Sequence, residues 1–130
     1  MTDSDRIEFA EMFKNRIKKF VVDNINFFKT LPKTEEAKII GRQLLRSSSS
    51  VGANYRAACR ARSQAEFHSK LSIVVEEAGE SVFWMEVLIE AKIVKQADLA
   101  ILIDEANQIL KIASASRKTV SKSKDFQFNR

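Results

Sequence analysis

Residues 37–58 read AKIIGRQLLRSSSSVGANYRAA, and their spacing is the clearest structural signal in the chain. Small and apolar residues recur in it at alternating steps of three and four, which places them on one face of a helix. Four consecutive serines at 47–50 are typical of a loop by composition, yet the spacing passes through them without a change of phase. We therefore predict one uninterrupted helix from about Thr34 to about Arg62. Its core stripe consists of Ala37, Ile40, Leu44, Ser47, Val51, Asn54 and Ala58.

The same alternation predicts a helix on each side of this one. The preceding helix covers about 5–31, because Pro32 has no backbone donor and disfavours a helical residue before it. The following helix opens at Ser63, whose hydroxyl and the Glu66 carboxylate are spaced to cap the first turn reciprocally. This helix is predicted to end near Ile93.

A fourth helix is predicted to fade near Ser116. Its apolar stripe consists of Leu99, Leu102, Ala106, Ile109 and Ala113. The chain has 130 residues with only 3 glycines and 1 proline, too few turn residues for a sheet protein. Four long helices with three short connections force antiparallel neighbours. We predict an all-α, antiparallel up-down-up-down four-helix bundle over 1–116, followed by a basic flexible tail over 117–130.

Catalytic and metal-binding chemistry has few candidate residues in this sequence. Cys59 is the single cysteine and His68 the single histidine, which leaves no disulfide, no two-histidine metal motif and no Glu-x-x-His pair. Cys59 lies among arginines, which favour a thiolate, although a cysteine beside Ala58 is more often a small packing residue. No stretch approaches the roughly 18 apolar residues of a membrane span. We predict a cytoplasmic protein that is not an enzyme and holds no cofactor or metal.

Positive charge is concentrated in the second predicted helix. Residues 38–70 carry seven basic side chains and one acid, whereas residues 71–90 carry five acids and no base. At about 100° per residue, four arginines fall within an arc of roughly 80° opposite the core stripe, in a row about 27 Å long. A guanidinium group binds two phosphate oxygens at once, so the row predicts an RNA or DNA backbone as its ligand. The predicted binding residues are Arg42, Arg46, Arg56, Arg60 and Arg62.

Two other interpretations of this row stay open. Charged residues opposite a core stripe are commonly no more than a solvated helix face. Alternatively, acids on the third helix of a neighbouring subunit pair with the arginines, and the protein is then a structural or protein-interaction oligomer. The acids opposite the core stripe of that helix are Glu76, Glu80 and Glu90.

The third predicted helix carries large apolar residues on two sides. Beyond its core stripe, which runs from Phe67 to Leu88, four more lie where a bundle helix normally carries polar residues. Scattered apolar residues are common on protein surfaces, but four large ones on one face predict a covering partner. Since no helix of a four-helix monomer is central, we predict a homo-oligomer. The predicted interface residues are Ile73, Phe83, Trp84 and Val87.

One further pattern runs through most of the chain. The stretch LLRSSSSVGANYRAA at 44–58 is followed by Arg62-Ser63, Glu66-Phe67, Glu76-Glu77-Ala78 and Phe83-Trp84. Together these stretches resemble the family of four-helix-bundle proteins named after the ribosomal-RNA intervening-sequence protein, and the resemblance extends to about residue 116. The matched positions are Arg46, Ser48, Gly52, Asn54, Arg62, Ser63 and Glu80.

The resemblance implies several properties beyond the fold. It implies a ring-like homopentamer without established catalytic residues, whose original members are encoded within insertions of the large-subunit rRNA gene. A related branch is the accessory protein of diversity-generating retroelements, a basic pentamer that binds nucleic acid and a reverse transcriptase, so a reverse transcriptase is an expected partner. The sequence departs from the family pattern at His68, a position more often apolar, and in lacking a glycine between the third and fourth helices.

Overall fold

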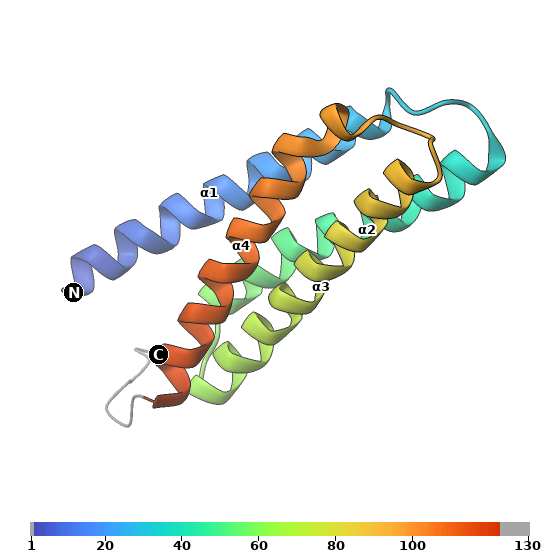
Figure 1. The fold of residues 1–130 in the computed structure, drawn as a ribbon. Coiled ribbons are helices and arrows are strands. Elements are labelled where there is room, and N and C mark those ends of the chain that lie inside the picture. Colours follow the sequence, from blue (N-terminus) through green and yellow to red (C-terminus); the bar gives the residue numbers. More distant parts are fainter. Residues whose placement is uncertain (1, 123–130) are drawn as a thin grey trace.

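The computed structural model describes residues 2–122, and all regular structure in that range is helical. Figure 1 shows long helices that run alternately up and down, joined by short connections. This arrangement confirms the predicted all-α bundle. The helices are α1 (Asp3–Phe28), α2 (Glu35–Cys59), α3 (Gln64–Glu90) and α4 (Gln96–Lys122).

Each helix packs against its neighbours in sequence, and contacts between α1 and α4 close the ring. Packing is most extensive between α2 and α3 and sparsest between α1 and α4, which diverge toward the N-terminus of α1 (Figure 1). The Arg16 side chain joins α1 to α4 across this sparsely packed seam. Its guanidinium donates to the Glu105 carboxylate at 2.7 and 2.8 Å and to Gln108 Oε1 at 2.7 Å. The hydrogen bond to Glu105 is the largest cause of a raised pKa of Arg16.

The serine run lies inside α2, which is one continuous helix as predicted. Ser47 and Ser48 are fully buried, and their hydroxyls donate to the carbonyl oxygens of Leu44 and Leu45, three residues back. Their side chains are small enough for α3 to come close, and the Ser81 hydroxyl donates to Ser47 Oγ at 2.9 Å. The serines therefore serve helix packing rather than a loop.

Hydroxyl side chains cap the N-termini of α2 and α3. Thr34 Oγ1 accepts from the backbone N–H of Ala37, and Ser63 Oγ accepts from that of Glu66 at 3.0 Å. The predicted return bond from Glu66 has a different donor: its carboxylate accepts from the backbone N–H of Arg62 at 3.3 Å. Arg62 lies in the connection between α2 and α3, so this hydrogen bond to Glu66 stabilises the turn that precedes α3.

The turn between α3 and α4 is built without glycine. Lys92 takes the left-handed conformation, with φ of 61°. Its N–H donates to the carbonyl of Ile89 and the N–H of Ile93 donates to that of Leu88, which is the bonding pattern of a Schellman motif. A residue with a Cβ costs about 1 kcal/mol in this conformation relative to glycine. The burial of Ile93 against the core helps to offset that cost.

The first three helices each end three residues before their predicted ends, at Phe28, Cys59 and Glu90. For α1 the reason is visible in the core. Leu31 is buried in the turn that follows the helix, next to Gly41 of α2. A Cβ at Gly41 would lie 2.7 Å from Leu31 Cδ1 and 2.8 Å from Phe28 Cε2, so any larger residue there would force these two side chains to move.

The fourth helix ends later than predicted. It continues past Ser116 to Lys122 because Val120 is buried and its carbonyl accepts a hydrogen bond from the Gln64 side chain of α3. The predicted tail is therefore wrong over 117–122. The remaining tail residues, 123–130, lie outside the described part of the chain.

The core lies along the middle of the bundle, between all four helices. Asn24 is buried within it, where its Nδ2 donates to the carbonyl of Phe20 at 2.8 Å. None of the helices in the described residues has a stretch sufficiently long and apolar to cross a membrane. The largest fully buried hydrophobic side chains are Phe13, Ile17, Phe20, Leu44, Leu71, Met85, Leu88, Leu99 and Ile109.

Candidate nucleic-acid interface

All five arginines of the predicted binding row are exposed, but they do not form one surface. Arg46 is held by two acids of α3. Arg56, Arg60 and Arg62 gather at the corner where α2 ends and α3 begins. Arg42 stands apart, about 21 Å from Arg56 at the helical rise of 1.5 Å per residue. The predicted row of about 27 Å is therefore interrupted near its middle.

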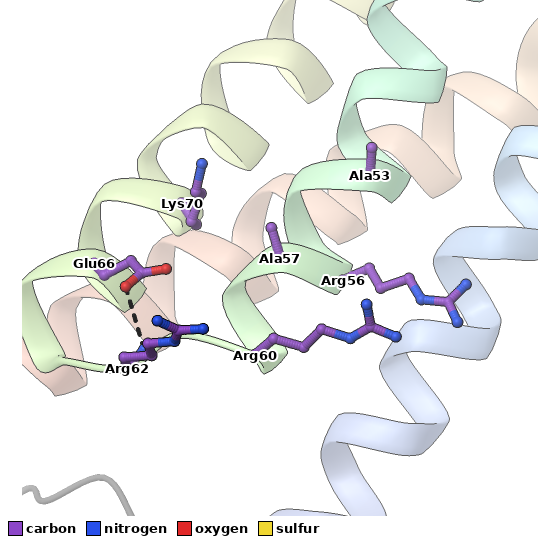
Figure 2. Close-up of a pocket in the computed structure, with 7 residues that line it drawn as sticks. All are labelled: Ala53, Arg56, Ala57, Arg60, Arg62, Glu66 and Lys70. Carbon is purple, nitrogen blue, oxygen red and sulfur yellow. Dashed lines mark hydrogen bonds between the residues drawn. The ribbon is translucent and has the colours of Figure 1, made fainter. Parts of the chain in front are cut away.

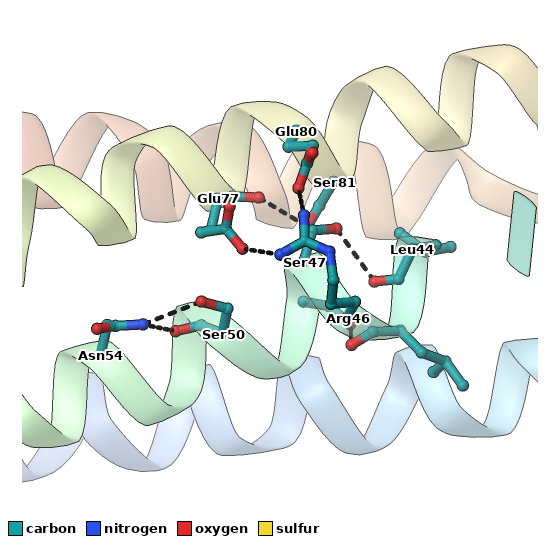
Figure 3. A network of polar contacts seen from close by, with 10 residues as sticks. Leu44, Arg46, Ser47, Ser50, Asn54, Glu77, Glu80 and Ser81 are labelled. Carbon is teal, nitrogen blue, oxygen red and sulfur yellow. Dashed lines mark hydrogen bonds and ion pairs between the residues drawn. The ribbon is translucent and has the colours of Figure 1, made fainter. Parts of the chain in front are cut away.

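Arg46 forms a bridge between α2 and α3 (Figure 3). Its guanidinium makes an ion pair with Glu77 at 3.1 Å and a second with Glu80. The bridge lies beside the buried hydrogen bond that joins Ser47 to Ser81. Two carboxylates already satisfy this guanidinium, so Arg46 contributes to helix packing, which the sequence did not predict.

The corner between α2 and α3 holds an open pocket of about 590 Å³. Ala57 lies near its middle and Ala53 at its edge, and Glu66 is the one acid among the residues that line it (Figure 2). The two alanines follow the outer face of α2 one turn apart, between the arginines of that face. The sequence alone places both alanines on this face, but only the fold shows that α3 lines the other side of the pocket. We call this pocket the basic corner, after its four cations, which are Arg56, Arg60, Arg62 and Lys70.

The arginines of the basic corner are available to a ligand. Within residues 2–122, the guanidinium groups of Arg56, Arg60 and Arg62 make no hydrogen bond or ion pair, and Arg62 is engaged only through its backbone. Figure 2 shows Arg56 and Arg60 reaching toward α1, whereas Arg62 and Lys70 lie on the α3 side. Four cations against one carboxylate leave the pocket with a net charge of +3.

The last turns of α4 carry further cations. Arg117 donates to Ser72 Oγ of α3 at 3.4 Å, and Lys118 is exposed. Because α4 runs antiparallel to α3, these turns lie at the end of the bundle where α3 begins (Figure 1). Positive charge therefore extends beyond the basic corner at this end of the bundle.

The thiol of Cys59, at the end of α2, is not activated by the nearby arginines. Desolvation raises its pKa, and a hydrogen bond with Tyr55 opposes that shift only in part. The thiolate considered in the sequence analysis is therefore not favoured. Within residues 2–122, no three His, Cys, Asp or Glu side chains are grouped so that they could hold a metal ion.

The predicted interface residues of α3 differ in their surroundings. Phe83 is 53% exposed, and its ring meets that of Trp84 edge-on at 4.8 Å between centroids. Trp84 is half-buried and packs against the core, and its buried Nε1 finds no acceptor among the described residues. Ile73 and Val87 are also half-buried. Phe83 is thus the most exposed of the four predicted interface residues.

Comparison with known proteins agrees with this fold. Residues 12–115 match the family model described as 23S rRNA-intervening sequence protein. The chain belongs to that family. It is also similar to the crystal structure of a protein of unknown function from the S23 ribosomal protein family of Bacteroides thetaiotaomicron VPI-5482. The two are 31% identical with a TM-score of 0.77, over 82% of this chain and 98% of that one. No curated protein gives a significant match.

Several of the positions that carry the family resemblance make packing contacts. Arg46 pairs with Glu80, which joins two of those positions across α2 and α3. Asn54 donates to a carbonyl one turn earlier at 2.9 Å. Gly52 makes room for α1, since an added Cβ would lie 3.0 Å from Val21 Cγ2. These contacts give the matched positions a role in the bundle itself.

We predict a measurable coupling across the bridge between Arg46 and Glu80. The Arg46 side chain is 52% exposed, so solvent screens the ion pair and the expected coupling energy is about 0.5–1 kcal/mol. A double-mutant cycle of Arg46→Ala and Glu80→Gln, followed by urea unfolding, measures it. Arg46→Lys should recover only part of the stability, because lysine lacks the planar fork that reaches two carboxylates. Strictly additive effects would show that the bridge does not stabilise the fold.

Proposed function

We propose that this family member is a non-catalytic, oligomeric accessory protein that binds RNA in the cytoplasm. The observation that supports RNA binding most directly is the basic corner. Three arginines whose guanidinium groups have no partner among the described residues, together with one lysine, line an open pocket. Guanidinium groups bind phosphate with two parallel hydrogen bonds, and phosphate contacts supply most of the affinity of sequence-independent binding.

The corner is a better candidate than the whole predicted row. A row of evenly spaced cations would follow a phosphate backbone, but Arg46 is bridged to α3 and Arg42 is isolated. The corner instead brings its cations together at the end of the bundle where α3 begins, and Arg117 of α4 donates to Ser72 in the same part of α3. We infer a local binding site, with further phosphates attracted along the end of the bundle.

A structural or protein-interaction oligomer is the second candidate. The bridge from Arg46 to Glu77 and Glu80 supports it, because it demonstrates arginine–glutamate pairing on these faces of α2 and α3. In this alternative, the basic corner pairs with acids of a neighbouring subunit, such as the exposed Glu76 and Glu90. Both candidates include a homo-oligomer, to which the exposed ring of Phe83 contributes a contact.

A salt titration of RNA binding tests the proposal. Wild-type protein should bind RNA with an affinity that falls with salt, by a log–log slope of about −0.7 per phosphate contact on single strands. The double variant Arg56→Gln/Arg60→Gln should bind at least about tenfold more weakly and with a slope shallower by roughly one to two. Fluorescence anisotropy at several salt concentrations measures both quantities.

The matched control removes the same charge elsewhere. Lys18 of α1 and Lys111 of α4 are exposed and make no ion pair within the described residues, so Lys18→Gln/Lys111→Gln lowers the net charge by the same two units. Equal losses in both double variants would contradict a localised site. If the corner variant instead changes the oligomer mass and leaves RNA binding intact, the second candidate is correct.

A further inference from the structure

The basic corner has an apolar floor that phosphate binding does not explain. Ala57, which is half-buried, lies between the cations of the two sides, and the exposed Ala53 lines the pocket one turn earlier on α2 (Figure 2). One turn earlier, the same outer face of α2 carries Ser49, which is exposed and lies outside the pocket. The pocket therefore combines cations with an alanine-lined floor along the outer face of α2.

The shape of the pocket selects between two forms of nucleic acid. A duplex presents phosphates on a convex surface and keeps its bases stacked inside, so it can reach the rim of a pocket but leaves the floor empty. An unpaired nucleotide brings a phosphate and the flat face of a base, which can stack on apolar groups, to the same place. Guanidinium groups also stack on unpaired bases, so the arginines can serve both parts of such a nucleotide.

We propose that the basic corner binds one unpaired nucleotide of a single-stranded segment. Its phosphate is held by Arg60 and Arg62, which lie on opposite sides of the pocket, and its base lies over Ala53 and Ala57. This inference rests on the proposed nucleic-acid function and adds the class of ligand to it. The recognised chemistry, a phosphate joined to an unpaired base, occurs in both RNA and single-stranded DNA.

Filling the floor without changing charge tests the proposal. Ala53→Leu places a larger side chain in the pocket and keeps every cation, and Ser49→Leu makes a similar change on the same face outside it. The probes are a uridine oligomer, the matching thymidine oligomer and an RNA duplex of equal length. We expect Ala53→Leu to lose about tenfold in affinity for the single strands and to keep its affinity for the duplex. Ser49→Leu should match the wild type with all three probes.

The outcomes separate this inference from the function on which it rests. If the wild type binds duplex and single strand equally and Ala53→Leu changes neither, RNA binding stands and the nucleotide pocket is refuted. If the wild type binds no probe, both proposals fail. Equal affinity for uridine and thymidine oligomers supports recognition of phosphate and base alone, whereas a preference for uridine supports the pocket with an added contact to the 2′-hydroxyl. Circular dichroism of both leucine variants verifies that they are folded.

Discussion

Ser49→Pro should destabilise the protein by about 3 kcal/mol or more. Ser49 lies in the middle of α2, between the buried pair Ser47–Ser48 and the contact of Gly52 with α1. Proline removes a helical N–H donor there, and its ring clashes with the carbonyl four residues earlier. Because α2 has the most extensive packing with α3, the kink would disturb that interface as well. Thermal unfolding should show a midpoint lower by about 10 °C.

Ser49→Ala provides the control for this substitution. The side chain of Ser49 is exposed, and alanine is the better helix former, so the free energy of unfolding should stay within about 0.5 kcal/mol of the wild-type value. A proline variant as stable and as helical as the alanine variant would mean that the serine run is not helical in solution.

Phe83→Glu should dissociate the proposed oligomer. In the single chain, Phe83 is 53% exposed and touches the edge of Trp84, so a charged residue there costs the monomer little. Within an interface, the same change removes a buried aromatic side chain worth about 1.5–3 kcal/mol and adds an unpaired charge. Light scattering should show a mass well above 14.8 kDa for the wild type and a mass near 14.8 kDa for the variant.

Val22→Glu on α1 is the matched control, since Val22 is also an exposed apolar residue. It should leave the mass unchanged if α3 provides the interface. Phe83 is a better target than Trp84, because Trp84 packs partly against the core and its substitution would confuse assembly with folding. A wild-type mass near 14.8 kDa would rule out the oligomer directly.

The repeating three-and-four spacing predicts every helix, because burial of one face requires that spacing whatever the partner helix is. It also predicts continuity through the serine run, where composition favours a loop. The ends of the helices are less predictable because they depend on single tertiary contacts. Leu31 leaves α1 to fill the space above Gly41, and Val120 prolongs α4 through its contact with Gln64.

The candidate site was predictable only in part. Sequence spacing places five arginines on or near one face, and all five are exposed. Spacing within one helix cannot show which of them meet an acid on another helix, since that depends on the register of α2 against α3. For that reason, the bridge from Arg46 to Glu77 and Glu80 and the closing of the pocket by Lys70 emerged only from the fold.

The contact between α1 and α4 can form only late in synthesis of the bundle. Arg16 and Glu105 are 89 residues apart, so α1 leaves the ribosome long before its partner on α4 has been made. Until then, α2 alone can cover the apolar face of α1, which includes Phe13 and Phe20. Exposed apolar surface of this kind is what chaperones bind and what aggregates. The nascent chain therefore exposes this face until α4 emerges, and docking of α4 against α1 is the step that ends the exposure.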